Sequence, residues 1–464
     1  MEIKFVDNTK DINCDVLVIN KYEGEQTSND LINKFAPDTF TGKAGEIFTM
    51  HTQGQYPSTY ITAVGFGSRE KLDGNIIREN IAKAVKKCNE LKAKTVAFDI
   101  EANQDTATVT IIGASAANYK FDKYKTKKDP KLEEIYVLKS APDAEQAKYI
   151  AEAMEFTRNL ANEPAEYATP TKLADIAQNI EGVETKVYGK EQIKQMGMGA
   201  FYAVARGSAE EPKFIHMKYS SPNPQKRIAI IGKGLCFDSG GLDIKPAASM
   251  LTMKDDMSGA ACILGVMKAL NKFRPDIEVH GIIAACENMP GCAAYKPGDI
   301  LTAKNGKTIE VDNTDAEGRL TLADALCYAC DLGVDEVIDI ATLTGACMVA
   351  LGTAASGIMG NNSDFVNEII KTGKSCGEKF WELPMWQEYR DNMNSDVADM
   401  KNTGTRYGGA SAAGMFLKEF VTDNVKWAHL DVAGTAFLDS PHKEFGKGAT
   451  GVGVRTILNY IISR

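Results

Sequence analysis

Four carboxylates in the second half of the chain have the types and spacing to carry chemistry. They are Asp238, Asp256, Asp315 and Glu317. Gathered in one cleft, such groups would repel one another and raise each other's pKa values. Two divalent cations would relieve the repulsion, because a carboxylate can bridge two metals about 3.5–4 Å apart. The set therefore indicates a dinuclear metal hydrolase, and a solvated acidic surface is the alternative.

Three cationic side chains accompany these acids. Lys233 and Lys245 flank Asp238 in the sequence, and Arg319 follows Glu317 by two positions. One lysine could bind a metal as a neutral amine, since a coordinated cation lowers the pKa of an amine. The other lysine could stay protonated and stabilise an oxyanion, and the arginine could orient an anion or polarise a transition state. Sequence spacing alone does not show that these residues converge.

Residues 313–320, with the sequence Asn-Thr-Asp-Ala-Glu-Gly-Arg-Leu, contain two of the acids and the arginine. They lie between a short apolar run at 308–311 and an apolar, helix-like run that begins at Leu320. This pattern predicts a loop that joins a strand end to a helix start. The simpler interpretation is a helix cap, because acids in a first turn satisfy free N–H groups and the helix dipole.

Other hydrolytic and nucleotide-binding mechanisms lack their motifs. The chain has no G-x-S-x-G elbow, no G-x-x-x-x-G-K-[ST] phosphate-binding loop, and no G-x-G-x-x-G fingerprint. Its five histidines are scattered and form no H-E-x-x-H motif. A mononuclear zinc site built on histidine is therefore disfavoured.

The elements around the acids predict an α/β fold with a mixed, largely parallel sheet flanked by helices. Residues 227–232 form a continuous apolar run typical of a buried parallel strand. A helix from about residue 258 and strands at 278–284 and 336–341 follow it. Lys233, Asp238 and Thr342 are predicted just past strand ends, where ligands bind in such sheets.

Two domains are expected from 464 residues. Residues 1–141 predict a small α/β domain of alternating strands and helices, and residues 142–464 a larger catalytic domain that begins with a linking helix. The net charge of −9 disfavours nucleic acid as a partner. No apolar run is long enough to span a membrane. Ten cysteines are too sparse for a disulfide scaffold, and they favour a reduced, cytoplasmic protein.

Five motifs together resemble the cytosolic leucyl aminopeptidase family of dinuclear metallopeptidases. They are the octet at 313–320, Gly-Lys-Gly at 232–234, Phe-Asp-Ser-Gly-Gly at 237–241, Ile-Lys-Pro at 244–246, and Met-Lys-Asp-Asp-Met at 253–257. Residues 162–164, 168–170, 395–402, 406–410, 429–435 and 451–456 extend the resemblance. It covers roughly residues 150–464 closely, whereas the first domain matches in layout only.

The resemblance implies two metal sites of different affinity. The tighter metal would be held by Lys233, Asp238, Asp256 and Glu317. The more exchangeable metal would be held by Asp238, Asp315 and Glu317, so that Asp238 and Glu317 bridge. Zinc and manganese are the expected metals, with magnesium as a third candidate. A hydroxide shared by the two metals would attack the first peptide carbonyl.

The resemblance also implies roles for the cationic residues and the pocket. Lys245 would stabilise the oxyanion, and Arg319 would hold a bicarbonate ion as general base, assisted by the backbone near Ala316, Gly318 and Leu343. One metal and Asp256 would bind the free α-amine of a peptide. The pocket for the first residue of the substrate would be lined by Met253, Asn313, Thr342 and Gly345. This pocket would favour leucine or methionine, with broad specificity.

Two departures and two alternatives accompany the resemblance. Cys236 stands where the family more often has threonine, and Asp255 adds an acid beside Asp256; both could alter the metal preference. The family is commonly homohexameric. The alternative functions are a DNA-binding regulatory protein of the same family, which the charge of −9 disfavours, and a narrower cysteinyl-glycine dipeptidase.

Overall fold

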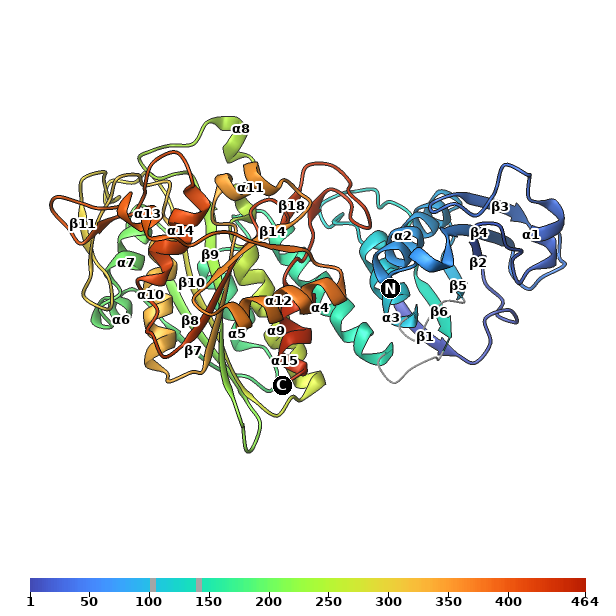
Figure 1. Cartoon of the computed structure of the whole chain (residues 1–464), viewed down its shortest axis with the longest axis horizontal. Coiled ribbons are helices and arrows are strands. Elements are labelled where there is room, and N and C mark those ends of the chain that lie inside the picture. Colours follow the sequence, from blue (N-terminus) through green and yellow to red (C-terminus); the bar gives the residue numbers. More distant parts are fainter. Residues whose placement is uncertain (101–105, 139–143) are drawn as a thin grey trace. The chain divides into compact units, whose positions relative to one another are not determined.

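The computed structural model describes residues 1–100, 106–138 and 144–464 (Figure 1). The chain forms two compact units. Unit 1 comprises Met1–Glu155 and Asp439–Lys447, and unit 2 comprises Phe156–Leu438 and Gly448–Arg464. The boundary predicted at residues 141/142 lies outside the described residues. Helix α4 (Ala144–Asn162) contributes residues to both units.

Unit 1 contains a six-stranded sheet in the order β1-β6-β5-β2-β4-β3. Every neighbouring pair is parallel except β3 with β4. The unit has the α/β architecture that its sequence predicts. The elements are β1 (Glu2–Val6), β2 (Val16–Tyr22), α1 (Asp30–Phe35), β3 (Ile47–His51), β4 (Tyr60–Gly67), α2 (Gly74–Glu90), β5 (Thr95–Asp99), α3 (Thr106–Asn118) and β6 (Glu134–Leu138).

Unit 2 contains an eight-stranded sheet in the order β15-β14-β17-β13-β9-β10-β8-β7. Its four central strands, β17, β13, β9 and β10, are mutually parallel, as the sequence predicts. The strands of unit 2 are β7 (Glu184–Tyr188), β8 (Lys213–Ser220), β9 (Arg227–Asp238), β10 (Glu278–Asn288), β11 (Ile300–Thr302), β12 (Thr308–Glu310), β13 (Glu336–Ala341), β14 (Ser356–Gly360), β15 (Phe380–Glu382), β16 (Met400–Lys401), β17 (Lys426–Asp431), β18 (Phe437–Leu438) and β19 (Gly448–Ala449).

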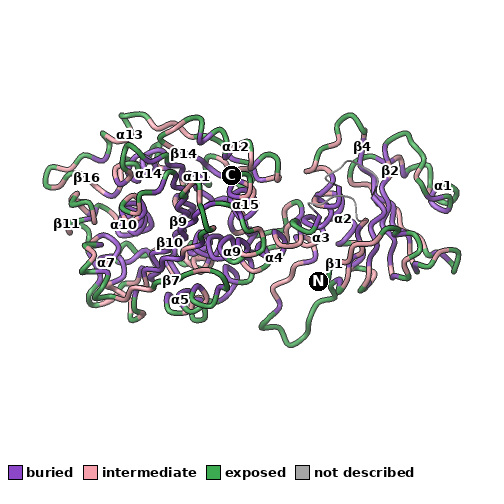
Figure 2. The backbone as a smooth tube through the Cα atoms, turned by 90° about the horizontal axis from the view of Figure 1, so that it is seen from below, coloured by how far each residue is buried: buried purple, intermediate pink, exposed green. Residues whose placement is uncertain are grey.

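Helices cover both faces of this sheet. Gly232 of β9 lies against Gly259 of α9, where an added Cβ would approach the Gly259 carbonyl oxygen to 2.5 Å. On the other face, Ala229 and Ile231 share a core with residues of α10 and α14. Figure 2 shows β9 and β10 as buried throughout most of their length. The helices are α5 (Pro170–Gln178), α6 (Lys190–Gln195), α7 (Gly199–Ala205), α8 (Ala247–Met250), α9 (Ser258–Phe273), α10 (Gly318–Asp331), α11 (Gly345–Leu351), α12 (Ser363–Cys376), α13 (Gln387–Asp391), α14 (Gly409–Lys418) and α15 (Val454–Ile462).

Strand β9 is longer than predicted. The sequence predicts a strand over 227–232, but β9 continues to Asp238. Strand β10 pairs with it over that whole length, with an irregularity between Cys286 and Glu287. Lys233 therefore lies inside a strand, and its prediction as a residue past the strand end is wrong. Asp238 is the last residue of the strand, and Thr342 follows β13, as expected.

A buried polar chain joins β8, β10 and α10 in unit 2. The Nε2 atom of His216 lies 2.9 Å from Nδ1 of His280, and Nε2 of His280 lies 2.9 Å from Oε1 of Glu278. The hydroxyl of Tyr328 lies 3.0 Å from Nδ1 of His216. Burial, followed by the charge of His280, lowers the pKa of His216 to about 4. The imidazole is therefore neutral in the folded protein at neutral pH.

Acidification should destabilise unit 2 through this histidine. Between pH 6.5 and about 4 the unfolded chain takes up a proton at residue 216 that the folded chain does not, so stability falls as the pH falls. The loss attributable to His216 is up to about 3 kcal/mol. Urea unfolding of the wild type and of His216→Gln at pH 7.5 and 4.5 measures it, and we expect the variant to lose less. His51→Gln, which removes an exposed histidine, should track the wild type. Equal losses of stability in all three proteins would mean that His216 is not the cause.

The ten cysteines are all free thiols, and Cys292 is exposed. Among the described residues, no helix combines the length and apolar character needed to cross a bilayer.

Candidate metal centre

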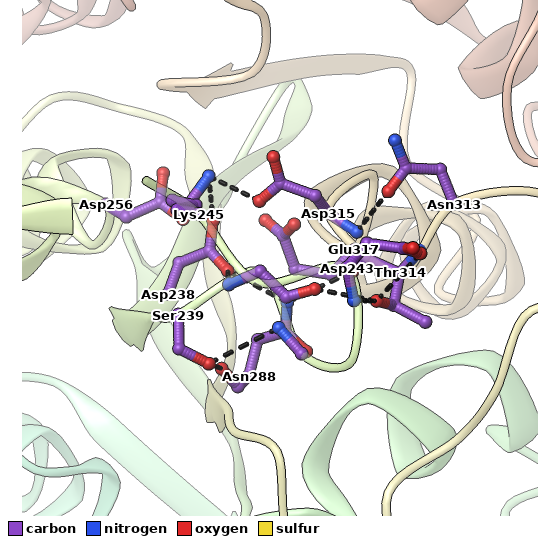
Figure 3. Close-up of polar contacts among 12 residues, drawn as sticks. Asp238, Ser239, Asp243, Lys245, Asp256, Asn288, Asn313, Thr314, Asp315 and Glu317 are labelled. Atoms are coloured by element: carbon purple, nitrogen blue, oxygen red, sulfur yellow. Dashed lines mark hydrogen bonds and ion pairs between the residues drawn. The ribbon is translucent and has the colours of Figure 1, made fainter. Parts of the chain in front are cut away.

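Three separate segments of unit 2 bring the predicted acids together at the carboxyl end of the parallel strands. Strand β9 ends at Asp238, and Asp256 directly follows a 3₁₀ turn at Met253–Asp255. Asp315 and Glu317 come from the loop that precedes α10. The loop begins after β12, which belongs to a small sheet with β11 and β16 and not to the main sheet. Figure 3 shows these side chains pointing toward one another.

The acids form a ligand set suited to a divalent cation. Asp238, Asp315 and Glu317 each present one oxygen atom, and these atoms all lie within 4.8 Å of one another. Oδ2 of Asp256 and Oε2 of Glu317 are buried and have no hydrogen-bond partner. Such unsatisfied buried oxygen atoms are costly unless a cation compensates them. The donor set therefore fits hard or borderline metal ions that accept carboxylate oxygens.

Burial and mutual repulsion act strongly on these acids. Burial raises the pKa of Asp256 well above its usual range; the charge of Glu317 adds to the shift, whereas Lys233 opposes it. Burial and the charge of Asp238 likewise raise the pKa of Glu317. The pKa of Asp315 is also raised, chiefly by burial. Divalent cations would favour the ionised forms of all three groups.

Lys233 is almost completely buried among carboxylates. Its Nζ lies 2.7 Å from Oδ1 of Asp256 and 2.9 Å from Oε1 of Glu317, and it donates to the carbonyl oxygen of Thr342 at 3.1 Å. Burial opposes its charge, but these acids outweigh burial and raise its pKa above the usual value. As a metal ligand the amine would have to give up its proton.

Gly318 makes room for the Lys233 side chain. A Cβ atom added at residue 318 would lie 2.3 Å from Cε and 2.7 Å from Nζ of Lys233. Lys233 is held on its other side by its ion pairs, so it could not move aside without breaking them. The glycine is therefore required by close approach and not by an unusual backbone angle.

Lys245 bridges two acids of the ligand set. Its Nζ lies 2.8 Å from Oδ2 of Asp238 and 2.5 Å from Oδ1 of Asp315 (Figure 3). The chain reaches it through Gly240 and Gly241, whose φ angles of 89° and 69° favour glycine. Asp238 and the other acids raise the pKa of Lys245 against the effect of burial, so it carries a full positive charge at neutral pH.

Arg319 lies in the first turn of α10 with a free donor. Its Nη1 donates to the carbonyl oxygen of Asn402 at 2.8 Å, and its buried Nε has no hydrogen-bond partner. Burial lowers the pKa of Arg319 to about 10, against the charges of Glu317 and Asp431, and the side chain stays cationic at neutral pH. A buried, cationic, unpaired N–H is suited to an anion.

Two of the three backbone groups predicted to assist Arg319 already have partners within the chain. The N–H of Leu343 donates to Oδ1 of Asp431 at 3.2 Å, and the N–H of Ala316 donates to the carbonyl oxygen of Asn313 at 3.3 Å. Both hydrogen bonds are long.

The four predicted pocket residues occupy different positions around the acids. Thr342 donates its hydroxyl proton to Oδ1 of Asp256 at 2.8 Å, and Oδ1 of Asn313 accepts the N–H of Asp315 at 2.7 Å. Gly345 begins α11, and a Cβ there would meet nothing within 4 Å. Met253 is half-buried at the start of the 3₁₀ turn. Asn313 and Arg319 also line an open cavity of about 390 Å³, which Met253, Thr342 and Gly345 do not line.

Sequence reasoning gave no role to two fully buried asparagines near the centre. Nδ2 of Asn288 donates to Oδ1 of Asp238 at 2.8 Å and to the carbonyl oxygen of Thr314 at 3.1 Å. Asn402 contacts the loop that carries Asp315 and Glu317. The only sequence signal for Asn402 was its position in the segment 395–402, which is part of the family resemblance. Asn288 had no comparable signal, because the strand was predicted to end at residue 284 and β10 continues to Asn288.

The two departures from the family pattern leave the ligand set intact. Cys236 is buried within β9, and burial raises the pKa of its thiol well above the usual value, so the thiol is neutral. Asp255 is largely buried in the 3₁₀ turn, and its carbonyl oxygen accepts the hydroxyl of Ser258.

Two family models match the chain, one for each unit. The model described as "Cytosol aminopeptidase family, catalytic domain" matches residues 155–458, and the one described as "Cytosol aminopeptidase family, N-terminal domain" matches residues 20–128.

Relatives match over nearly the whole chain. A probable cytosol aminopeptidase of Aquifex aeolicus is 46% identical over 485 residues, covering 100% of this chain and 98% of that protein. One from Persephonella marina is 45% identical and covers 92% of this chain and 89% of that protein. Among solved structures, a mutant of tomato leucine aminopeptidase has a TM-score of 0.90 and 35% identity, covering 100% and 97% of the two chains. The bottromycin maturation enzyme BotP in complex with Mn has a TM-score of 0.89 and 30% identity, covering 97% and 99%.

Proposed function

Because the chain belongs to the cytosol aminopeptidase family and is a metal-dependent aminopeptidase, we propose that the acids and Lys233 bind two divalent cations. The observation that carries this proposal is the group of three carboxylate oxygens within 4.8 Å of one another, with further unsatisfied oxygens beside it. The tighter site uses Lys233, Asp238, Asp256 and Glu317, and the exchangeable site uses Asp238, Asp315 and Glu317.

The metals are manganese or zinc, with magnesium as a third candidate. The donor set contains four carboxylates and one amine, and carboxylates suit manganese and magnesium as well as zinc. The solved structure of BotP, which is similar over almost the whole chain, is a complex with Mn. When bound, the two ions polarise the scissile carbonyl and lower the pKa of water enough to make a nucleophile near neutral pH.

The side chains of the centre orient the substrate and stabilise charge. Lys245 stays protonated and stabilises the negative charge that develops on the carbonyl oxygen of the peptide. Asp256, which Thr342 holds by a hydrogen bond, accepts from the free α-amine of the substrate. This contact restricts cleavage to the first peptide bond.

Arg319 holds an anion beside the metals. Its unpaired, buried Nε is the donor that supports this proposal. Bicarbonate is the proposed anion, and it acts as the general base that receives a proton during attack. The start of α10 at Gly318 adds to the anion site. The N–H groups of Ala316 and Leu343 complete the site by exchanging their long internal hydrogen bonds for it.

Peptides are the substrates, and we propose a broad preference with leucine and methionine favoured at the first residue. Met253, Asn313, Thr342 and Gly345 line the pocket for that residue, where the open space beside Gly345 admits a large side chain. An apolar pocket discriminates one methylene by only about 1–3 kcal/mol, so other residues are accepted. We propose a cytoplasmic homohexamer, following the family pattern and the names of the relatives.

Acetylation of the substrate amine tests the exopeptidase assignment. With manganese present, we expect N-acetyl-leucine p-nitroanilide to be hydrolysed at least about 100-fold more slowly than leucine p-nitroanilide. Acetylation turns the amine into an amide, whose delocalised lone pair is no longer available to a metal, and it removes an N–H donor that Asp256 would accept from. An unpaired buried acceptor is costly. Initial rates over a range of substrate concentrations give kcat/KM for both compounds. Equal values would mean that the enzyme does not require a free amine.

A further inference from the structure

Asn402 is completely buried and bonds to a loop far from it in sequence. It directly follows β16, which pairs with β12 in parallel, and its N–H donates to the carbonyl oxygen of Glu310 at 3.0 Å. This pairing aligns the asparagine with the residues that follow β12. Those residues are the loop 311–317, which carries Asp315 and Glu317.

The side chain of Asn402 satisfies four backbone groups of that loop. Its Oδ1 accepts from the N–H of Asp312 at 2.8 Å and from the N–H of Asn313 at 3.3 Å. Its Nδ2 donates to the carbonyl oxygen of Asn313 at 2.7 Å and to that of Ala316 at 3.4 Å. Both donors and both acceptor positions of one amide are therefore used on one short segment.

These bonds enclose one of the proposed metal ligands. Asp315 lies between Asn313 and Ala316, whose carbonyl oxygens both bond to Asn402. Its own N–H is held by Oδ1 of Asn313. The backbone carbonyl of Asn402 also accepts from Nη1 of Arg319 at 2.8 Å. One residue outside the ligand set thus touches the loop of Asp315 and the side chain of Arg319.

We propose that Asn402 is a positioning residue that sets the affinity of the exchangeable metal site by fixing the loop of Asp315. The inference rests on the proposed ligand assignment. Groups that orient ligands in this way typically change metal affinity by about 10–100-fold when they are replaced. The tighter site should respond less, because three of its four ligands lie outside that loop: Lys233 and Asp238 in β9, and Asp256 directly after the 3₁₀ turn.

Asn402→Asp isolates this role. The variant has the same size and can still accept from the N–H groups of Asp312 and Asn313, but a carboxylate cannot donate to the two carbonyl oxygens. We expect the weaker of the two manganese dissociation constants to rise about 10–100-fold, while the tighter one changes less than about threefold. Manganese titration of metal-free protein, followed by the electron paramagnetic resonance signal of free Mn²⁺, measures both constants without reference to activity. Asn402→Ala repeats the test by removing the whole amide.

Asn361→Asp is the control, at a more exposed asparagine. The side chain of Asn361 also bridges backbone groups of unit 2, because it accepts from the N–H of Trp427 and donates to the carbonyl oxygen of Val425, both at 2.8 Å. We expect both manganese constants of this variant to remain at the wild-type values. If Asn402→Asp and Asn361→Asp lower the melting temperature alike and leave both constants unchanged, Asn402 has only a structural role and the inference is overturned.

Asp315→Asn separates this inference from the proposed function. Loss of the weaker manganese site in Asp315→Asn, together with wild-type constants in both Asn402 variants, would overturn the role of Asn402 alone. Retention of both sites in Asp315→Asn would overturn the ligand assignment itself. Weakening of the same site by Asp315→Asn and by the Asn402 variants supports both.

Discussion

Glu317→Gln should lower kcat/KM for leucine p-nitroanilide by at least about 10³-fold, or about 4 kcal/mol of transition-state stabilisation. Glu317 is one of the two ligands proposed to bridge both metals. Its Oε1 lies 2.9 Å from Lys233, and its buried Oε2 is unsatisfied and available to a cation. A neutral amide is a weaker ligand for a hard cation and cannot bridge two metals as a carboxylate does. Steady-state rates with manganese at saturation provide the measurement.

The stability of Glu317→Gln distinguishes a lost ligand from a lost fold. Burial and the charge of Asp238 raise the pKa of Glu317, which means that its ionised form is unfavourable next to the other acids. Removing this charge should leave the melting temperature of the chelated protein equal to or above that of the wild type. Glu287→Gln is the control: Glu287 is a carboxylate of β10 whose pKa is raised by burial and which accepts from the hydroxyl of Ser208. Glu287→Gln should keep kcat/KM within about threefold of the wild-type value. Wild-type activity in Glu317→Gln would refute the dinuclear assignment.

Removing the metals should abolish activity, and manganese or zinc should restore it. Without metals, the side chains of the centre do not supply a nucleophile and a base, because its acids and lysines form ion pairs with one another. Dialysis against a strong chelator followed by titration with each metal gives the activity as a function of bound ions. We expect full activity to require two ions per chain.

The same titration should stabilise the fold. A ligand that binds only the folded protein adds about 2.7 kcal/mol at a free concentration of 100 times its Kd. The melting temperature should therefore rise with metal concentration in parallel with the activity. Chelator that has been saturated with manganese beforehand should not inhibit, which excludes a direct effect of the chelator. Persistence of activity after the metal content falls below one ion per ten chains would contradict metal dependence.

The strands and helices with regular apolar patterns could be predicted from the sequence, but one consequential boundary could not. The buried run at 227–232 identified β9, and the apolar spacing after residue 258 identified α9. The predicted end of β9 was wrong because Gly232, Lys233 and Gly234 carry turn-like sequence signals. Their extended conformation is imposed by β10, which is about 50 residues away and pairs with them throughout. Local sequence propensity does not reflect pairing with a strand so distant in the sequence.

The residues of the centre were easier to identify than the residues that hold them. Carboxylates and lysines at strand ends are unusual enough to attract attention. Asparagines such as Asn288 and Asn402 are common surface residues, and they gain importance here only through hydrogen bonds from their side chains to backbone atoms 26 and 86–90 positions away. These bonds depend on how separate loops come together in the folded chain, which no single segment of the sequence determines.

The contact between Gly318 and Lys233 has a consequence for the comparison of related genomes. The Lys233 side chain fills the space that a side chain at position 318 would need, so the two positions cannot vary independently of each other. A related gene that encodes a side chain at position 318 should encode a smaller residue at position 233, and its product would then lack the amine. Inspection of these two codons should therefore separate genes for working peptidases from copies that keep the fold and have diverged to another role.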